Sequence, residues 1–183
     1  MTAAIRTVPN IGTDVLINFV AFQLGWWCCV LGAAQNNPLI GPFAVALIVL
    51  AHLLRARGKS AESLFIVCAV ALGAVGDSAL MYTGWIVYPS TWIDGIAPLW
   101  ILALWAVFAT TINVSMRWLH GRDLLAAVLG AIAAPLSYWG GVRLGAATFV
   151  HPTAALIALA CGWALAMPLL LWLAQRLDGY AAR

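Results

Sequence analysis

The sequence predicts an all-α, polytopic transmembrane bundle of six spans with both termini in the cytoplasm. Of its 183 residues, 64% are apolar and only 8% are charged, whereas soluble globular proteins carry roughly 25% charged residues. The mean hydropathy is +0.99. Basic residues also fall unevenly on alternate loops. These observations indicate a single transmembrane domain with no soluble catalytic domain beside it.

Span length sets the number of helices. The hydrocarbon core of a bilayer is about 30 Å thick and an α-helix rises about 1.5 Å per residue, so one span needs about 20 mostly apolar residues. Six such segments nearly exhaust the chain. The predicted spans cover about residues 14–34, 39–54, 63–82, 99–118, 124–149 and 152–173.

The first two spans form a tight outer hairpin. Asp14 caps the start of the first span, where a carboxylate suits the helix dipole. Its apolar stretch is too long, and too interrupted by Asn18 and Gln23, for a signal peptide. A short turn at 35–38 leads into the second span, which ends in a basic run at 55–59.

The third span is the most polar, because it carries Asp77 and Ser78 after two glycines. The loop that follows, residues 83–98, is rich in Trp and Tyr, which sit at headgroup level. We expect this loop, Tyr88 included, to lie along the outer membrane surface.

The last three spans follow with short connections. The fourth span ends in a polar and basic stretch. The fifth begins near Asp123 and is expected to kink at Pro135, because proline removes one backbone hydrogen bond. The sixth starts at Pro152.

Counting Lys and Arg by loop gives the orientation. With six spans, one side of the membrane carries eight basic residues and the other carries Arg143 alone. This asymmetry predicts a cytoplasmic N-terminus and a cytoplasmic C-terminus. The eight are Arg6, Arg55, Arg57, Lys59, Arg117, Arg122, Arg176 and Arg183.

Asp77 is the first candidate for function, because charged side chains inside spans are costly and usually face a partner or a water-filled cavity. Arg143 of the fifth span lies at a similar depth, so we expect an ion pair. The pair could be a structural tie between helices or part of a ligand or proton site. Ser78, Ser137 and Tyr138 are the hydroxyl groups expected beside it.

A second polar layer is expected nearer the cytoplasm. Asn18 and Gln23 of the first span could meet Asn113 and its threonine neighbours in the fourth span. Hydrogen bonds between spans favour the interpretation that this layer holds helices together, over a role in ligand binding.

Several function classes lack their motifs. Three scattered histidines supply no metal site, and neither a nucleotide-binding glycine loop nor a Gly-x-Ser-x-Gly elbow is present. The net charge of +3 is too scattered for nucleic acid. We therefore expect no metal, no cofactor and no nucleic-acid partner.

Four short patterns occur along the chain: Asn18-Phe19-x3-Gln23-x2-Trp26, Gly73-x2-Gly76-Asp77-Ser78, Pro98-x-Trp100 with Trp105, and Pro135-x-Ser137-Tyr138 before Gly145-Ala146. Together they resemble a family of bacterial inner-membrane proteins described only as a domain of unknown function. The resemblance covers the first five spans. It implies an inner-membrane location and a lipid-linked role, since genes of that family often lie near genes for fatty-acyl lipid modification.

The favoured function is a small membrane protein that binds or translocates a small or amphipathic, lipid-like ligand at the Asp77 and Arg143 site. An alternative is a membrane-embedded enzyme acting on a lipid or acyl chain, with Asp77 as acid or base. A second alternative is a scaffold subunit without catalysis. The sequence leaves open whether the chain forms a homo-oligomer.

Overall fold

The computed structural model describes residues 11–91, 93 and 95–181, and this part of the chain is built from six α-helices. Two short strands, β1 (Ile86–Val87) and β2 (Thr148–Phe149), pair antiparallel. The all-α class is thereby confirmed. The helices are α1 (Ile11–Ala34), α2 (Ile40–Arg55), α3 (Lys59–Tyr82), α4 (Leu99–Ile112), α5 (Asp123–Arg143) and α6 (Pro152–Arg176).

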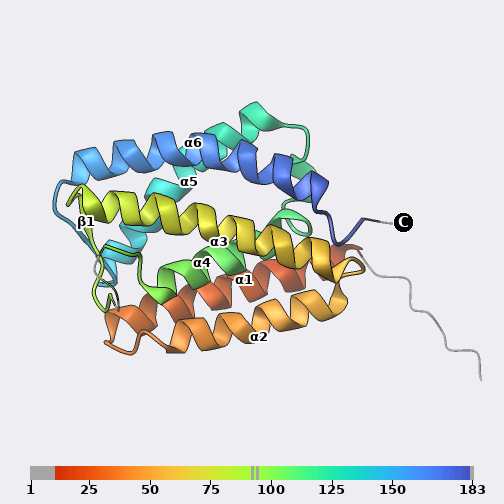
Figure 1. Ribbon diagram of the computed structural model, residues 1–183, viewed down its shortest axis with the longest axis horizontal. Helices are drawn as coiled ribbons and strands as arrows, with labels where there is room; N and C mark the ends of the chain where they lie inside the picture. Colours follow the sequence, from red (N-terminus) through yellow and green to blue (C-terminus); the bar gives the residue numbers. More distant parts are fainter. Residues whose placement is uncertain (1–10, 92, 94, 182–183) are drawn as a thin grey trace, which may run out of the picture.

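The helices lie side by side along the long axis of the molecule (Figure 1). α1 begins and α6 ends at one end of the bundle, and β1 lies at the opposite end. α4 packs against α1, α2 and α3, and most of its residues are buried. α5 packs mainly against α6. The site described below lies where α1, α3, α4, α5 and α6 come together.

Close contact between α5 and α6 depends on Gly130. A Cβ atom added there would lie 2.5 Å from the carbonyl oxygen of Trp163. Since real side chains almost never approach a backbone atom so closely, only glycine allows this separation of the two helices.

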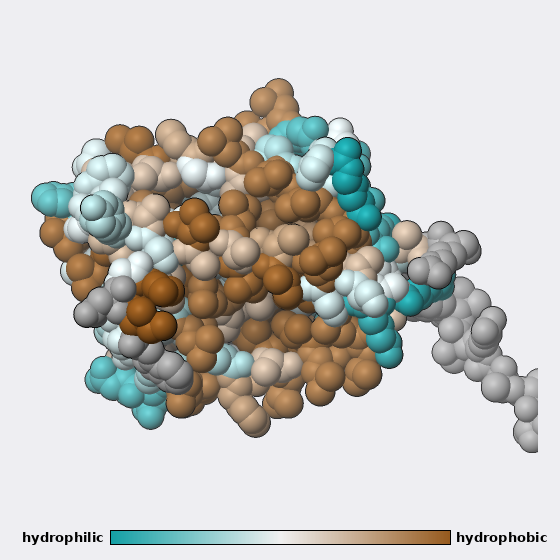
Figure 2. Space-filling view, in the orientation of Figure 1, coloured by the Kyte–Doolittle hydropathy of each residue, from teal (hydrophilic) through white to brown (hydrophobic). Residues whose placement is uncertain are grey.

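The chain is a helical membrane protein. Four helices, α1, α3, α5 and α6, are long and apolar enough to cross a bilayer. An apolar belt covers the middle of the molecule, and hydrophilic residues gather at its two ends (Figure 2). Large apolar side chains of the long helices are exposed, including Val75, Leu124 and Leu165, each more than 70% exposed. A patch of this extent is typical of a surface that faces lipid.

Several predicted boundaries are wrong. α4 ends at Ile112 rather than near 118, and a single 3-10 turn (Arg117–Leu119) follows it. α5 ends at Arg143 rather than 149, because Gly145 adopts a φ of +89° and residues 148–149 pair with β1. α3 begins at Lys59, earlier than predicted. Trp92 and Asp94 of the predicted outer loop lie outside the described residues.

Candidate intramembrane site

The carboxylate of Asp77 is buried and accepts hydrogen bonds from three neutral donors. Tyr88 Oη donates at 2.6 Å and Trp105 Nε1 donates at 2.8 Å. Tyr138 Oη lies 2.8 Å and 3.0 Å from the two carboxylate oxygens. Only 1% of Asp77 is exposed. Four separate parts of the chain, α3, the loop between α3 and α4, α4 and α5, therefore meet at this one side chain.

Gly73 allows Trp105 to reach Asp77. The two α3 residues are four positions apart and so lie on one face of the helix. A Cβ atom at Gly73 would lie only 2.2 Å from Cγ of the Trp105 ring. The indole of α4 can therefore lie flat against α3, and its N–H reaches the carboxylate one turn further on.

The loop between α3 and α4 turns the side chain of Tyr88 into the bundle; that this loop lies along the outer membrane surface stays a prediction. Tyr88 is 3% exposed, because its hydroxyl is drawn to the Asp77 carboxylate. Pairing of β1 with β2 fixes the loop beside it. Ser78 Oγ accepts a hydrogen bond from the backbone N–H of Ala97 at 2.9 Å. Ser78 thus holds the loop and is not among the residues that line the cavity described next.

The predicted ion pair between Asp77 and Arg143 is absent. Arg143 is exposed at the last position of α5, about 140° around the helix from Tyr138 at 100° per residue. The three neutral donors occupy the carboxylate instead. Among the described residues, the salt bridges join His52 to Glu62, Arg55 to Asp14 and Arg117 to Asp178.

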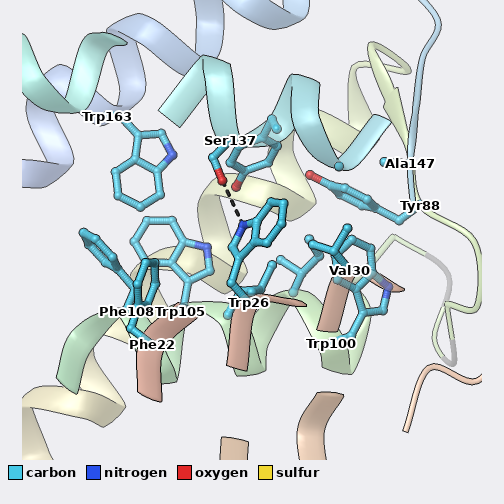
Figure 3. Close-up of a pocket in the computed structure, with 14 residues that line it drawn as sticks. Phe22, Trp26, Val30, Tyr88, Trp100, Trp105, Phe108, Ser137, Ala147 and Trp163 are labelled. Carbon is cyan, nitrogen blue, oxygen red and sulfur yellow. Dashed lines mark hydrogen bonds between the residues drawn. The ribbon is translucent and has the colours of Figure 1, made fainter. Parts of the chain in front are cut away.

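A cavity of about 90 Å³ lies beside Asp77. Figure 3 shows Phe22, Trp105, Phe108 and Trp163 grouped at one end of it, with Tyr88 at the other. Trp105 and Trp163 stack at 4.5 Å with 17° between their planes. Eight of its fourteen lining side chains are aromatic: Phe22, Trp26, Tyr88, Trp100, Trp105, Phe108, Tyr138 and Trp163.

The cavity reaches the surface between α1 and α5. Trp26 of α1 donates its indole N–H to Ser137 Oγ of α5 at 3.0 Å (Figure 3). This hydrogen bond is exposed, so it lies at the rim of the cavity. Gly140, one turn along α5 from the bridge, has only Trp26 within 4 Å of an added Cβ. The Trp26 indole and its hydrogen bond to Ser137 therefore border the opening of the cavity.

The second polar layer forms in part. Asn18 Nδ2 donates to the Thr110 carbonyl at 3.1 Å, and Asn18 Oδ1 accepts from the Ser115 N–H at 3.3 Å. The prediction that Asn18 ties the first span to the fourth is confirmed. Gln23 is half-buried and does not line the cavity. Asn113 joins a different cluster.

That cluster surrounds Glu62, which the sequence reasoning missed. Glu62 is fully buried. Its carboxylate lies 2.8 Å from His52 Nε2, and it accepts from Asn113 Nδ2 and the Gly179 N–H, each at 3.0 Å. Glu62 belongs to the buried face of α3 that also carries Ala69, Gly73 and Asp77, so its helical spacing was the signal that could have revealed it.

The Glu62 cluster fastens the segment after α6 to the rest of the bundle. Tyr180 donates its hydroxyl to the His52 carbonyl at 2.6 Å. Burial, and then the nearby Glu62 carboxylate, raise the pKa of Tyr180 to about 12. Asp178 also pairs with Arg117 at 2.8 Å. These contacts hold the segment after α6 against the end of the bundle, and they are separate from the cavity.

A family model described as "Protein of unknown function (DUF2878)" matches residues 15–169. The match covers most of α1, all of α2 to α5 and most of α6, and it includes every residue of the Asp77 site. No curated protein and no solved structure matches the chain.

Proposed function

The chain belongs to the DUF2878 family of proteins of unknown function, and we propose that it binds a single-chain amphipathic molecule in the aromatic cavity beside Asp77. The alkyl chain leaves the cavity between α1 and α5, past Ser137, and the polar end lies at the inner wall near Tyr88 and Tyr138. Arg143, which was expected to share this site, has no role in the proposal.

The environment of Gly141 carries the proposal. Gly141 is a buried residue of α5 and lines the cavity. Nevertheless, a Cβ atom added there would meet nothing within 4 Å. Packed protein interiors leave few voids larger than a water molecule, and one water needs only about 10–15 Å³. A cavity of about 90 Å³ is room for a group of several heavy atoms.

The walls suit an amphipath better than a polar metabolite. Aromatic side chains dominate them, while Tyr88, Tyr138 and Ser137 supply a few hydroxyl groups. Small-molecule sites commonly combine an apolar lining with a few polar groups that fix orientation. Since the rim lies on the outer surface of a membrane bundle, a ligand dissolved in the bilayer could enter sideways.

The proposal includes the six-span topology in a bacterial inner membrane. α2 and α4, with 16 and 14 residues, are about 24 Å and 21 Å long at 1.5 Å per residue. These two helices either cross a bilayer whose hydrocarbon core is thin or locally compressed, or end below the lipid headgroups. Eight of the nine basic residues then lie on the cytoplasmic side. This arrangement places Asp77 in the outer half of the membrane.

The hydrogen bonds and the burial of Asp77 favour ligand binding over catalysis as its role. A general base needs a free carboxylate oxygen within reach of the substrate. Both oxygens of Asp77 already accept hydrogen bonds, and the side chain is 1% exposed. A membrane-embedded enzyme that uses Asp77 would first have to move Tyr88 or Tyr138 away.

Photolabelling tests the proposal. The purified protein in lipid nanodiscs is irradiated with a hexadecyl chain that carries a diazirine, and the labelled residues are mapped by mass spectrometry. We expect saturable labelling of cavity residues such as Trp26 and Ser137.

Two leucine variants make the test specific. Gly141→Leu fills the cavity and should abolish the saturable labelling. Gly162→Leu is the matched control, because Gly162 is an exposed helical glycine of α6 with nothing within 4 Å of an added Cβ. Equal labelling of both variants, spread over lipid-facing side chains, would show that the cavity holds no ligand.

A further inference from the structure

We propose that the cavity selects an amphipath with a cationic head, an alkylammonium or quaternary ammonium group, over neutral and anionic amphipaths of the same chain length. This inference rests on the proposed function and adds the charge of the ligand. It follows from three features of the site: an unbalanced carboxylate, inward-facing aromatic rings and the absence of basic side chains from the cavity lining.

The first feature is the charge on Asp77. Trp105 Nε1 can only donate, so its hydrogen bond requires an acceptor oxygen on the carboxylate. The two tyrosine hydroxyls lie against the same carboxylate. Three donors around one group favour the ionised form against the cost of burying the charge. Neutral donors stabilise this negative charge without cancelling it, and none of the salt bridges among the described residues includes Asp77.

The second feature is the way this charge reaches the cavity. Tyr88 and Tyr138 stand between Asp77 and the cavity. Because each gives its hydroxyl hydrogen to Asp77, a phenol oxygen of this wall can accept a hydrogen bond from a ligand but cannot donate one. A ligand that donates hydrogen bonds or carries positive charge is favoured at this wall.

The third feature is the aromatic wall itself. The faces of Trp and Tyr rings are electronegative and attract cations within about 6 Å of the ring centroid. Trp26 donates to Ser137 at the rim of the cavity, and Trp105 stacks on Trp163 (Figure 3). No Lys, Arg or His is among the fourteen lining residues. A fatty-acid carboxylate would find neither a cation nor a charged donor there.

Competition against the diazirine probe tests the inference. Three competitors share a ten-carbon chain: decyltrimethylammonium, its uncharged isostere with carbon in place of nitrogen, and decanoate. Their concentrations are expressed as mole fractions in the nanodisc, so that unequal partitioning into the bilayer is corrected. We expect the cation to displace the probe at a mole fraction at least tenfold lower than either of the others.

Asp77→Asn and Trp26→Leu connect this preference to the site. Asp77→Asn should bring cation and isostere to within about threefold of each other, while saturable labelling remains. Trp26→Leu keeps an apolar wall but loses the aromatic ring face, so it should also reduce the preference for the cation over the isostere. If Asp77→Asn does not fold, Trp26→Leu alone tests whether this preference arises at the cavity. If the cation and the isostere displace the probe equally from the unmodified protein, the preference for a cationic head is overturned, but the proposed function is not. Absence of saturable labelling overturns the proposed function itself.

Discussion

Replacing Gly73 with alanine should loosen the centre of the bundle. The new Cβ would lie 2.2 Å to 2.3 Å from three atoms of the Trp105 ring, Cγ, Cδ1 and Cδ2. These are the inner atoms of a rigid ring, so the whole indole or the helix must move. Movement of Trp105 breaks its 2.8 Å hydrogen bond to Asp77.

The size of the effect is the sum of three contributions. Overpacking a well-filled interior costs about 1–3 kcal/mol. Loss of a hydrogen bond to a charged group costs about 1.5–3 kcal/mol. Alanine recovers about 1 kcal/mol relative to glycine within a helix. The free energy of unfolding of Gly73→Ala should therefore fall by roughly 1.5–5 kcal/mol.

Reversible unfolding in mixed micelles, followed by far-ultraviolet circular dichroism, measures this change. Gly76→Ala is the matched control, because Gly76 lies in the same helix with nothing within 4 Å of an added Cβ; its unfolding free energy should stay within about 1 kcal/mol of the unmodified value. The near-ultraviolet signal of the stacked Trp105–Trp163 pair should also weaken in Gly73→Ala only. If Gly73→Ala and Gly76→Ala have the same free energy of unfolding, the close packing of Trp105 against α3 is wrong.

Three further changes test other parts of the structure. Gly130→Ala places a Cβ 2.5 Å from the Trp163 carbonyl oxygen and should destabilise the α5–α6 contact by about 1–3 kcal/mol in the same unfolding assay; no loss would contradict the close approach of these helices. Glu62→Ala leaves His52 and the Gly179 N–H without their shared buried acceptor. The free energy of unfolding should therefore fall by about 3–5 kcal/mol, and proteolytic cleavage beyond residue 176 should become faster, whereas Glu62→Gln should have a smaller effect on both. Unchanged cleavage in Glu62→Ala would show that Glu62 does not hold this segment to the bundle. The pKa of Tyr180, raised from 10.0 to about 12, means that the unfolded chain loses this proton first, so the contribution of Tyr180 to stability is complete below pH 10 and is lost as the pH rises toward 12. Ultraviolet titration should show a tyrosine near 12 that Tyr180→Phe removes, and a spectrum that Tyr180→Phe leaves unaltered would disprove the assignment.

Composition and hydropathy were sufficient for the class of fold, because the cost of exposing apolar side chains to water leaves few alternatives. Positions of polar residues within the spans were also informative. Asp77 and Asn18 were both expected to contact neighbouring helices, and both do. Such side chains must find partners inside a membrane.

The identity of those partners could not be predicted. Depth along a helix suggested Arg143 for Asp77, but a hydrogen-bonding partner must also lie on the correct face of its helix. Tyr88 was the least predictable, since its place depends on the pairing of β1 with β2, which residue spacing does not reveal. α3 also begins four residues earlier than predicted, at Lys59, so Glu62 lies on the buried face of this helix and not in a loop.

Anomalous diffraction from crystals grown in a lipid phase with a brominated decyltrimethylammonium tests the central claim most directly. With bromine on the carbon next to the head group, we predict one strong bromine peak in the cavity among Trp26, Tyr138 and Trp163. Peaks confined to the apolar belt on the outer surface, with the cavity empty of ligand, would contradict the account.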